Sequence, residues 1–294
     1  MEFITAFLNN AANDDDIRNG TEYAGRVGIQ VTMPKWGISR SDFVGDPERK
    51  IIAKGLSSVK FISGSVAEEL YQIAHKRTYD RFIDVLEALN GESSLNSHQL
   101  DILIKLDFFS DFGNQRELLR ITDLFTNLFK SGEVRKLARD RVDGTPLEPI
   151  VQKYAVGTTK AGGVAKAYTM LDVESVMRET EDAVKAVGME DLPLLTKVHN
   201  FSEIMGYAGY TTGREEDRRK LYVSDVYPLV RKKDGKQFGY SIVTKSIGSG
   251  KDARFTVFNK VYEPDPIHKG DIVYCKSFER DGIYFRLTDY EKIV

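Results

Sequence analysis

The chain has 294 residues, of which 41% are hydrophobic and 29% charged; this predicts a globular protein of two or three compact units and excludes a disordered one. Its single cysteine, Cys275, excludes a disulfide framework and a cysteine-rich zinc site, and no apolar run approaches a membrane span, so we expect a cytoplasmic protein. The net charge of −2 is unevenly divided, because residues 218–294 carry sixteen Lys and Arg against ten Asp and Glu, while residues 1–217 carry 26 against 34. The basic C-terminal part is therefore the better electrostatic candidate for nucleic acid.

The first fifty residues predict two helices and a strand. Residues 3–12 fit one helix, a segment from Asp14 to about Gly28 fits a second, and the strand IQVTMP ends at Pro34. Three consecutive carboxylates, from Asp14 to Asp16, stand where a helix dipole favours negative charge. We therefore interpret them as a solvated helix start rather than as a metal site.

Residues 51–71, IIAKGLSSVKFISGSVAEELY, predict a short helix, a tight hairpin and a second helix. This arrangement presents backbone amides at a helix N-terminus to a nucleic-acid phosphate. We expect Gly64 to allow the turn, Ser65 to cap the second helix and Glu68 to complete a capping box. The alternative is a purely structural pair of helices. The residues predicted to contact phosphate are Lys60, Ser63, Gly64 and Ser65.

Residues 95–113, LNSHQLDILIKLDFFSDFG, predict a second unit of the same kind, in which Asn96 is the N-cap and Gln99 its reciprocal partner. Asp107 and Asp111 make the end of this unit acidic, so we interpret it as structural. A packing helix lies between the two units, and another follows over residues 115–130.

These segments resemble a known family. The run from FITAFLNN through GIQVTMP, SRSDF, KGLSSVKF and VAEELY to LNSHQLDILIKLDFFSDFG is similar, in order and spacing, to the end of the fingers and the helix-hairpin-helix region of the bacterial DNA polymerase III α subunit. A later EIMGYAGY element and a strand-rich tail look like that subunit's clamp-binding segment and OB domain. The family usually places glycines at the positions of Phe61 and Ser63, and side chains there hinder a close approach of DNA to the backbone.

The sequence ITDLF at 121–125 resembles the second half of the peptide by which bacterial replication proteins attach to the sliding clamp. The resemblance implies clamp binding by Asp123, Leu124 and Phe125, although Ile121 stands where that peptide begins with glutamine. The same apolar residues also fit the buried stripe of the helix predicted over 115–130. Packing within the helical region is the alternative.

Residues 132–203 predict a helical connector. LEPIVQKY and DVESVMRETEDAVKAVG fit helices, and we interpret the intervening AVGTTKAGGVAKAY as a flexible connection because of its glycine, alanine and lysine content. That segment contains no Gly-Lys-Ser/Thr ending, so a nucleotide-binding P-loop is not expected.

From about residue 221 the hydrophobic period changes to two. Five strand candidates separated by glycine-containing turns suit an OB-type barrel, and their order is also compatible with another small barrel. Aromatic and basic residues alternate along them, a mixture that binds single-stranded nucleic acid by stacking and by phosphate contacts. About half of the aromatic side chains, which include Phe258 and Tyr284, must nevertheless fill the core. The predicted DNA-binding residues are Tyr240, Lys245, Lys251, Arg254, Phe255, Lys260 and Arg286.

The predicted fold is α+β and multidomain, with an all-helical helix-hairpin-helix region followed by a small five-stranded OB-like β-barrel. We expect a segment similar to the end of the fingers at 1–52, the helix-hairpin-helix region at 53–131, the connector at 132–203 and the barrel at 204–294. The resemblance implies a DNA-binding and positioning part of a DNA-directed DNA polymerase, a nucleotidyltransferase.

The scattered histidines and the lack of a nucleophile arrangement predict no catalytic site, cofactor or metal site in this chain. We expect DNA as the partner, as duplex at the hairpin and as single strand at the barrel. The alternative function is a replisome scaffold that docks the sliding clamp or another subunit with little direct DNA binding.

Overall fold

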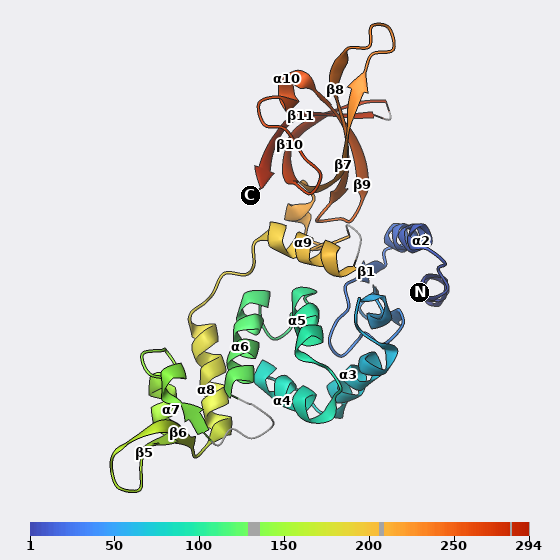
Figure 1. The fold of residues 1–294 in the computed structure, drawn as a ribbon. Helices are drawn as coiled ribbons and strands as arrows, with labels where there is room; N and C mark the ends of the chain where they lie inside the picture. Colours follow the sequence, from blue (N-terminus) through green and yellow to red (C-terminus); the bar gives the residue numbers. More distant parts are fainter. Residues whose placement is uncertain (129–135, 206–208, 283, 294) are drawn as a thin grey trace. The chain divides into compact units, whose positions relative to one another are not determined.

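In a computed structural model of the protein, residues 1–128, 136–205, 209–282 and 284–293 are described (Figure 1). The chain folds into two compact units, Met1–Leu192 and Pro193–Val294. The division into four segments stays a prediction, and its boundary at 131 lies outside the described residues, as does the middle of EIMGYAGY. In the ranges given above, no helix is both long and apolar enough to cross a membrane.

The first unit begins with two helices packed on a small sheet. Helices α1 (Glu2–Asn9) and α2 (Asp14–Arg26) cover strands β1 (Gln30–Thr32), β2 (Val44–Asp46) and β3 (Ile51–Ala53), whose spatial order is β1-β3-β2. The side chain of Asn13 accepts a hydrogen bond from the amide of Asp16, so Asn13 is the N-cap of α2. The core of this part contains Ile4, Leu8, Ala24, Val31 and Ile52.

The helical region follows. Its elements are the 3₁₀ turn η1 (Leu56–Ser58), α3 (Gly64–Lys76), α4 (Phe82–Glu92), α5 (Ser97–Lys105) and α6 (Gln115–Leu128). The short helix expected at the start of the first hairpin is wrong, because residues 51–53 pair with β1 and β2 and leave only one 3₁₀ turn before the hairpin. Trp36 and an aromatic cluster that includes Phe82, Phe108 and Phe109 fill the interior.

Both helices expected in the connector are present, as α7 (Glu148–Tyr154) and α8 (Val173–Ala186). Helix α8 packs against α4 and α6, so it belongs to the first unit. The buried carboxylate of Glu181 accepts hydrogen bonds from the amides of Phe82 and Ile83, each at 3.1 Å, and forms an ion pair with Lys185 at 2.7 Å. A side chain of α8 thereby caps the N-terminus of α4.

The segment interpreted as a flexible connection forms a β-hairpin instead. Strands β5 (Ala155–Thr158) and β6 (Val164–Met170) pair with each other, and β6 also pairs with β4 (Lys136–Ala138), which precedes the 3₁₀ turn η2 (Arg139–Arg141). Arg139 fixes the hairpin by donating hydrogen bonds to the carbonyls of Gly157 and Ala165 at 2.9 and 2.8 Å. The glycines that suggested flexibility supply the turn, since Gly162 has a φ of +81°.

The second unit contains α9 (Leu194–Met205), the 3₁₀ turn η3 (Glu215–Asp217) and a closed barrel. The barrel strands are β7 (Lys220–Val230), β8 (Gln237–Ser246), β9 (Asp252–Phe258), β10 (Ile272–Asp281) and β11 (Tyr284–Ile293). Their order around the barrel is β7-β8-β9-β11-β10, with β9 and β11 parallel and the short helix α10 (Asn259–Tyr262) after β9. The predicted small, five-stranded, OB-like β-barrel is therefore confirmed.

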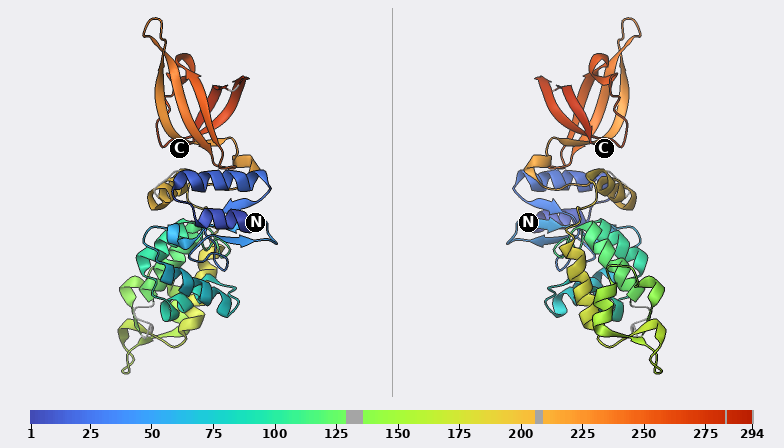
Figure 2. Two further views of the ribbon diagram at one scale, coloured as in Figure 1. Left: turned by 90° about the vertical axis from the view of Figure 1, so that its right-hand side faces the viewer. Right: turned by 90° about the vertical axis from the view of Figure 1, so that its left-hand side faces the viewer.

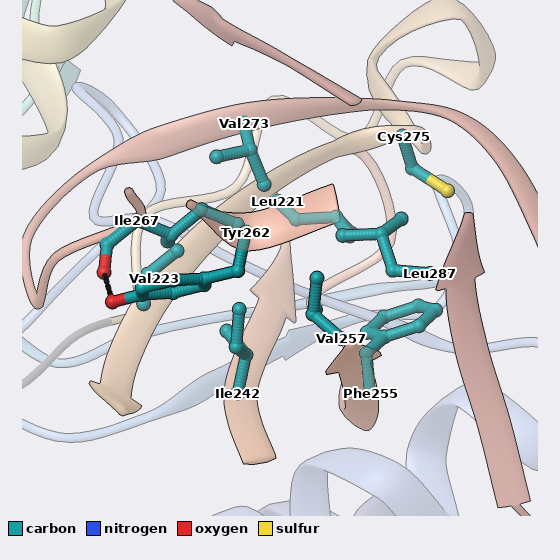
Figure 3. Packing of buried hydrophobic residues seen from close by; sticks show 10 residues of the cluster. All are labelled: Leu221, Val223, Ile242, Phe255, Val257, Tyr262, Ile267, Val273, Cys275 and Leu287. Carbon is teal, nitrogen blue, oxygen red and sulfur yellow. Dashed lines mark hydrogen bonds between the residues drawn. The ribbon is translucent and has the colours of Figure 1, made fainter. Parts of the chain in front are cut away.

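The barrel is filled by aliphatic and aromatic side chains from all five strands and from α10 (Figure 3). Tyr262 lies in this core, and its hydroxyl donates a hydrogen bond to the carbonyl of Ile267 at 2.7 Å. Burial raises the pKa of the Tyr262 hydroxyl and also that of the Cys275 thiol. Cys275 is thus a packing residue with a protonated, unreactive sulfur.

Candidate nucleic-acid interface

Solvent-exposed polar and aromatic side chains gather at the first hairpin. Val59 and Ile62 are 2% and 6% exposed and anchor the tip in the helical region, so the residues between and after them point outward. A neighbouring exposed ring comes from the start of α5. We call this surface the hairpin surface; its members are Lys60, Phe61, Ser63, Ser65 and His98.

The N-terminus of α3 lies within the hairpin surface. Its N-cap is Ser63, whose hydroxyl accepts a hydrogen bond from the amide of Val66 at 3.4 Å and lies 2.9 Å from the hydroxyl of Ser65. The expectation that Ser65 caps this helix is therefore wrong, because the helix begins at Gly64 and its cap stands two residues before Ser65. Helix starts of this kind favour anions, since amides and the helix dipole point at them.

The capping box expected at Glu68 does not form. Glu68 instead accepts two hydrogen bonds from Arg40, at 3.1 and 2.8 Å, and these bonds lower the pKa of its carboxyl group. The guanidinium of Arg40 also lies 4.6 Å from the ring centre of Tyr71. Arg40 is therefore held by side chains of α3.

The turn itself is made by Phe61 and not by Gly64. Phe61 has a φ of +69°, a left-handed conformation that side chains other than glycine's rarely adopt. Gly64 is the first helical residue, and a Cβ there would lie 3.1 Å from the Ser41 hydroxyl oxygen. The position at which the family usually has glycine thus keeps the glycine-like backbone but carries an aromatic ring.

The second helix-hairpin-helix segment, residues 95–113, contributes to the same surface. Asn96 and Gln99 form the expected capping box, with the two backbone-to-side-chain hydrogen bonds at 3.0 and 2.9 Å. The side-chain amide nitrogen of Gln99 also donates a hydrogen bond to the carbonyl of Phe61 at 2.7 Å. The ring centres of Phe61 and His98 lie 5.3 Å apart. We interpreted this unit as structural from its sequence and so missed His98. A histidine in the first turn of a capped helix was the only available signal.

The structure buries two of the three residues that resemble a clamp-binding peptide. On α6, Leu124 and Phe125 are 7% and 6% exposed, and Asp123 forms an ion pair with Arg120 at 3.1 Å. Ile121 is buried as well, at 1%. These side chains form the stripe by which α6 packs, which is the alternative that the sequence left open.

Two of the predicted DNA-binding residues of the barrel point inward. Phe255 is 6% exposed and lies beside Val257 and Leu287 in the core (Figure 3). The ring of Tyr240 stacks on Tyr262 with centres 3.7 Å apart and packs against the same core. Strand alternation buries Phe255, so its ring is not available for stacking on a base, whereas Tyr240 is half-buried and its predicted contact stays a prediction.

Other predicted residues share the outer surface of β8, β9 and β11. Arg254 is exposed opposite Val243, and Lys245 forms an ion pair with Asp252 at 3.0 Å on the same side of the sheet. Arg286 lies opposite Thr256, with its guanidinium 4.8 Å from the ring centre of Phe258. Lys251 and Lys260 lie apart from this row, in the turn before β9 and on α10. We call the row the barrel face; its members are Lys245, Arg254, Phe258 and Arg286.

A basic loop next to the barrel face was missed. Residues 231–236, RKKDGK, connect β7 to β8 and project from one end of the barrel (Figures 1 and 2). All six are exposed, and in the described part of the chain the ammonium groups of Lys232, Lys233 and Lys236 have no partner. The sequence showed this segment as a turn at Asp234-Gly235. The sequence alone gives no reason to select this charged turn. The barrel gives one, because OB folds bind nucleic acid with the loop between their first two strands.

The described residues contain no group of three or more His, Cys, Asp or Glu side chains that could hold a metal ion. The hairpin surface and the barrel face each combine polar or cationic groups with an aromatic ring, which are the groups that contact phosphates and bases in nucleic-acid complexes.

Comparisons with known proteins agree with this geometry. Residues 28–119 match the family model of the helix-hairpin-helix motif. The chain is also 26% identical to the DNA polymerase III subunit alpha of Ureaplasma parvum serovar 3 over 121 residues, which make up 40% of this chain and 12% of that protein. The chain thus covers about an eighth of that relative's length. Together with the barrel, these matches confirm the resemblance to the C-terminal portion of that subunit.

Proposed function

We propose that this chain is a DNA-binding and positioning part of a replicative DNA polymerase of the DNA polymerase III α type. In this function the hairpin surface holds duplex phosphates and the barrel binds the single-stranded template, and neither surface performs the chemistry. The matches to the helix-hairpin-helix motif and to a polymerase subunit support DNA as the ligand.

One observation carries the proposal. In a chain with a negative net charge, the loop between β7 and β8 carries three exposed lysines, Lys232, Lys233 and Lys236, that have no partner among the described residues. Nearby, the guanidinium of Arg286 lies over the ring of Phe258 and is also paired with Glu279. Cations that follow the phosphates and rings that stack on bases are what a single strand requires. The position is also the one that OB folds use for oligonucleotides.

The test is binding of the whole chain to a labelled single strand across a salt series. We expect binding that weakens steeply with salt, and we expect the variant Lys232→Ala/Lys233→Ala/Lys236→Ala to lower the log–log slope by about 2, since each lost phosphate contact removes about 0.7. The matched control replaces three exposed lysines of the first unit, Lys136, Lys160 and Lys166, with alanine. Equal slopes for the two triple variants would exclude the loop as the site.

The alternative function is a replisome scaffold with little direct DNA binding, and the acidic balance of residues 1–217 favours it. Docking of the sliding clamp on Asp123, Leu124 and Phe125 would require two buried side chains to leave the packing of α6. The scaffold would therefore use another surface. Absence of single-strand and duplex binding at low salt would support it.

A further inference from the structure

The exposed ring of Phe61 is not explained by packing or by phosphate binding. Its side chain is 69% exposed although it follows a buried anchor, Val59, by two residues and directly precedes another, Ile62. The left-handed backbone turns the ring into solvent, and glycine would make the same turn without strain. A large apolar side chain at a strained and exposed position indicates a ligand that packs against that side chain.

The ring is held in place rather than free to collapse. The carbonyl of Phe61 accepts the 2.7 Å hydrogen bond from Gln99, whose side-chain oxygen is in turn fixed by the amide of Asn96. His98 meets the ring nearly edge to face, with an angle of 61° between the planes. Both exposed rings are thus oriented by the capping box of α5.

The neighbours of the ring identify the class of ligand. Lys60 precedes it, and the hydroxyls of Ser63 and Ser65 follow at the start of α3, so donors suited to a phosphate flank an aromatic face. A ring beside phosphate donors matches one nucleotide unit, with its base on the ring and its phosphate on the donors. An apolar peptide would not need the donors.

We propose that Phe61, supported by His98, stacks on an unpaired nucleobase, as found in a single-stranded overhang next to a duplex. This inference rests on the proposed DNA contact at the hairpin and adds a second contact to it. The side chain that blocks close approach of the backbone to a duplex thereby provides a binding site for a base.

The test compares three labelled DNAs with the whole chain: a blunt duplex, the same duplex with an overhang, and the same overhang with abasic sites in place of its bases. We expect the wild type to prefer the base-containing overhang to the abasic one. We expect Phe61→Gly to reduce affinity for the base-containing overhang by about 5- to 150-fold, the range that one stacked base contributes, and to abolish the preference for this overhang over the abasic one.

Two further variants separate stacking from folding and from hydrophobic contact. Phe61→Leu keeps an apolar side chain without a ring and should also lose the preference for the overhang, whereas Phe61→Trp should retain it. Glycine suits the left-handed backbone, so Phe61→Gly should stay folded, with thermal melting as the check. Equal affinities of the wild type and Phe61→Gly for the base-containing overhang would overturn the inference. If the wild-type chain does not bind the blunt duplex at all, that result would instead overturn the proposed function of the hairpin.

Discussion

Lys60 shows how burial of neighbours determines the direction of a side chain. Val59 and Ile62 are buried, so the chain between them forms a tip whose side chains face solvent. The hydroxyl of Ser63 meanwhile serves the first turn of α3. In the proposed function, the contact with DNA depends on one cation beside a helix start, and such contacts position a duplex without reading its sequence.

Replacing Lys60 with Glu should weaken binding of blunt duplex about tenfold at low salt, because a phosphate contact is lost and a like charge is introduced. The loss should be the same for duplexes of different sequence. The measurement is fluorescence anisotropy with two unrelated duplexes. Lys60 is exposed, so the free energy of unfolding should change by no more than about 0.5 kcal/mol.

The control for this experiment is Lys76→Glu, which makes the same charge change at the other end of α3, where Lys76 forms an exposed ion pair with Glu92. It should weaken duplex binding less than Lys60→Glu does, because the charge change lies at the far end of a 13-residue helix and charge effects fall with distance. If both variants bind as the wild type does, the hairpin is structural.

Helix α4 illustrates how one element depends on another. Its own N-cap position, Arg81, supplies no side-chain cap, and the buried carboxylate of Glu181 on α8 takes that place. A helix that the sequence assigns to a connector therefore completes the helix-hairpin-helix region. The hairpin surface rests on the packing of this region.

We expect Glu181→Gln to lower the free energy of unfolding by about 2–3 kcal/mol, because the amide nitrogen of glutamine would face a buried N–H donor and leave it unsatisfied. Urea unfolding followed by circular dichroism measures the change. The adjacent Asp182→Asn, which removes only an exposed ion pair with Arg81, should cost less than about 1 kcal/mol. If the two variants lose the same free energy of unfolding, the buried contact of Glu181 contributes no more to stability than the exposed ion pair does.

The whole molecule combines a helical unit with a barrel part that carries a positive surplus, sixteen Lys and Arg against ten Asp and Glu in residues 218–294. In the described residues the acidic side chains are dispersed in ion pairs and caps and do not converge on a metal site. Template-directed synthesis needs clustered carboxylates that hold two metal ions.

Accordingly, the chain should not extend a primed template in the presence of magnesium and all four nucleotides. Gel analysis of a labelled primer measures this, with an active polymerase as the positive control for substrate quality. Extension that follows this chain through successive purification steps would contradict the prediction.

Several features of the fold were accessible because they depend on local patterns. Alternation of apolar residues indicated five barrel strands, and the spacing of Asn96 and Gln99 indicated their capping box. Other features were not accessible. The sequence of residues 155–168 contains glycines suited equally to a flexible segment and to a hairpin, and only the hydrogen bonds of Arg139 decide between them.

By itself, the sequence determined the class of each half of the chain and its resemblance to a polymerase subunit, because helical and strand periods and capping spacings are local. The tertiary structure alone decided which side chains form the surfaces proposed for binding. It turned Phe255 into the barrel core, packed Tyr240 against that core, brought His98 beside Phe61, and placed a basic loop next to the barrel face. These outcomes depend on register and on contacts between distant segments, which local patterns do not specify.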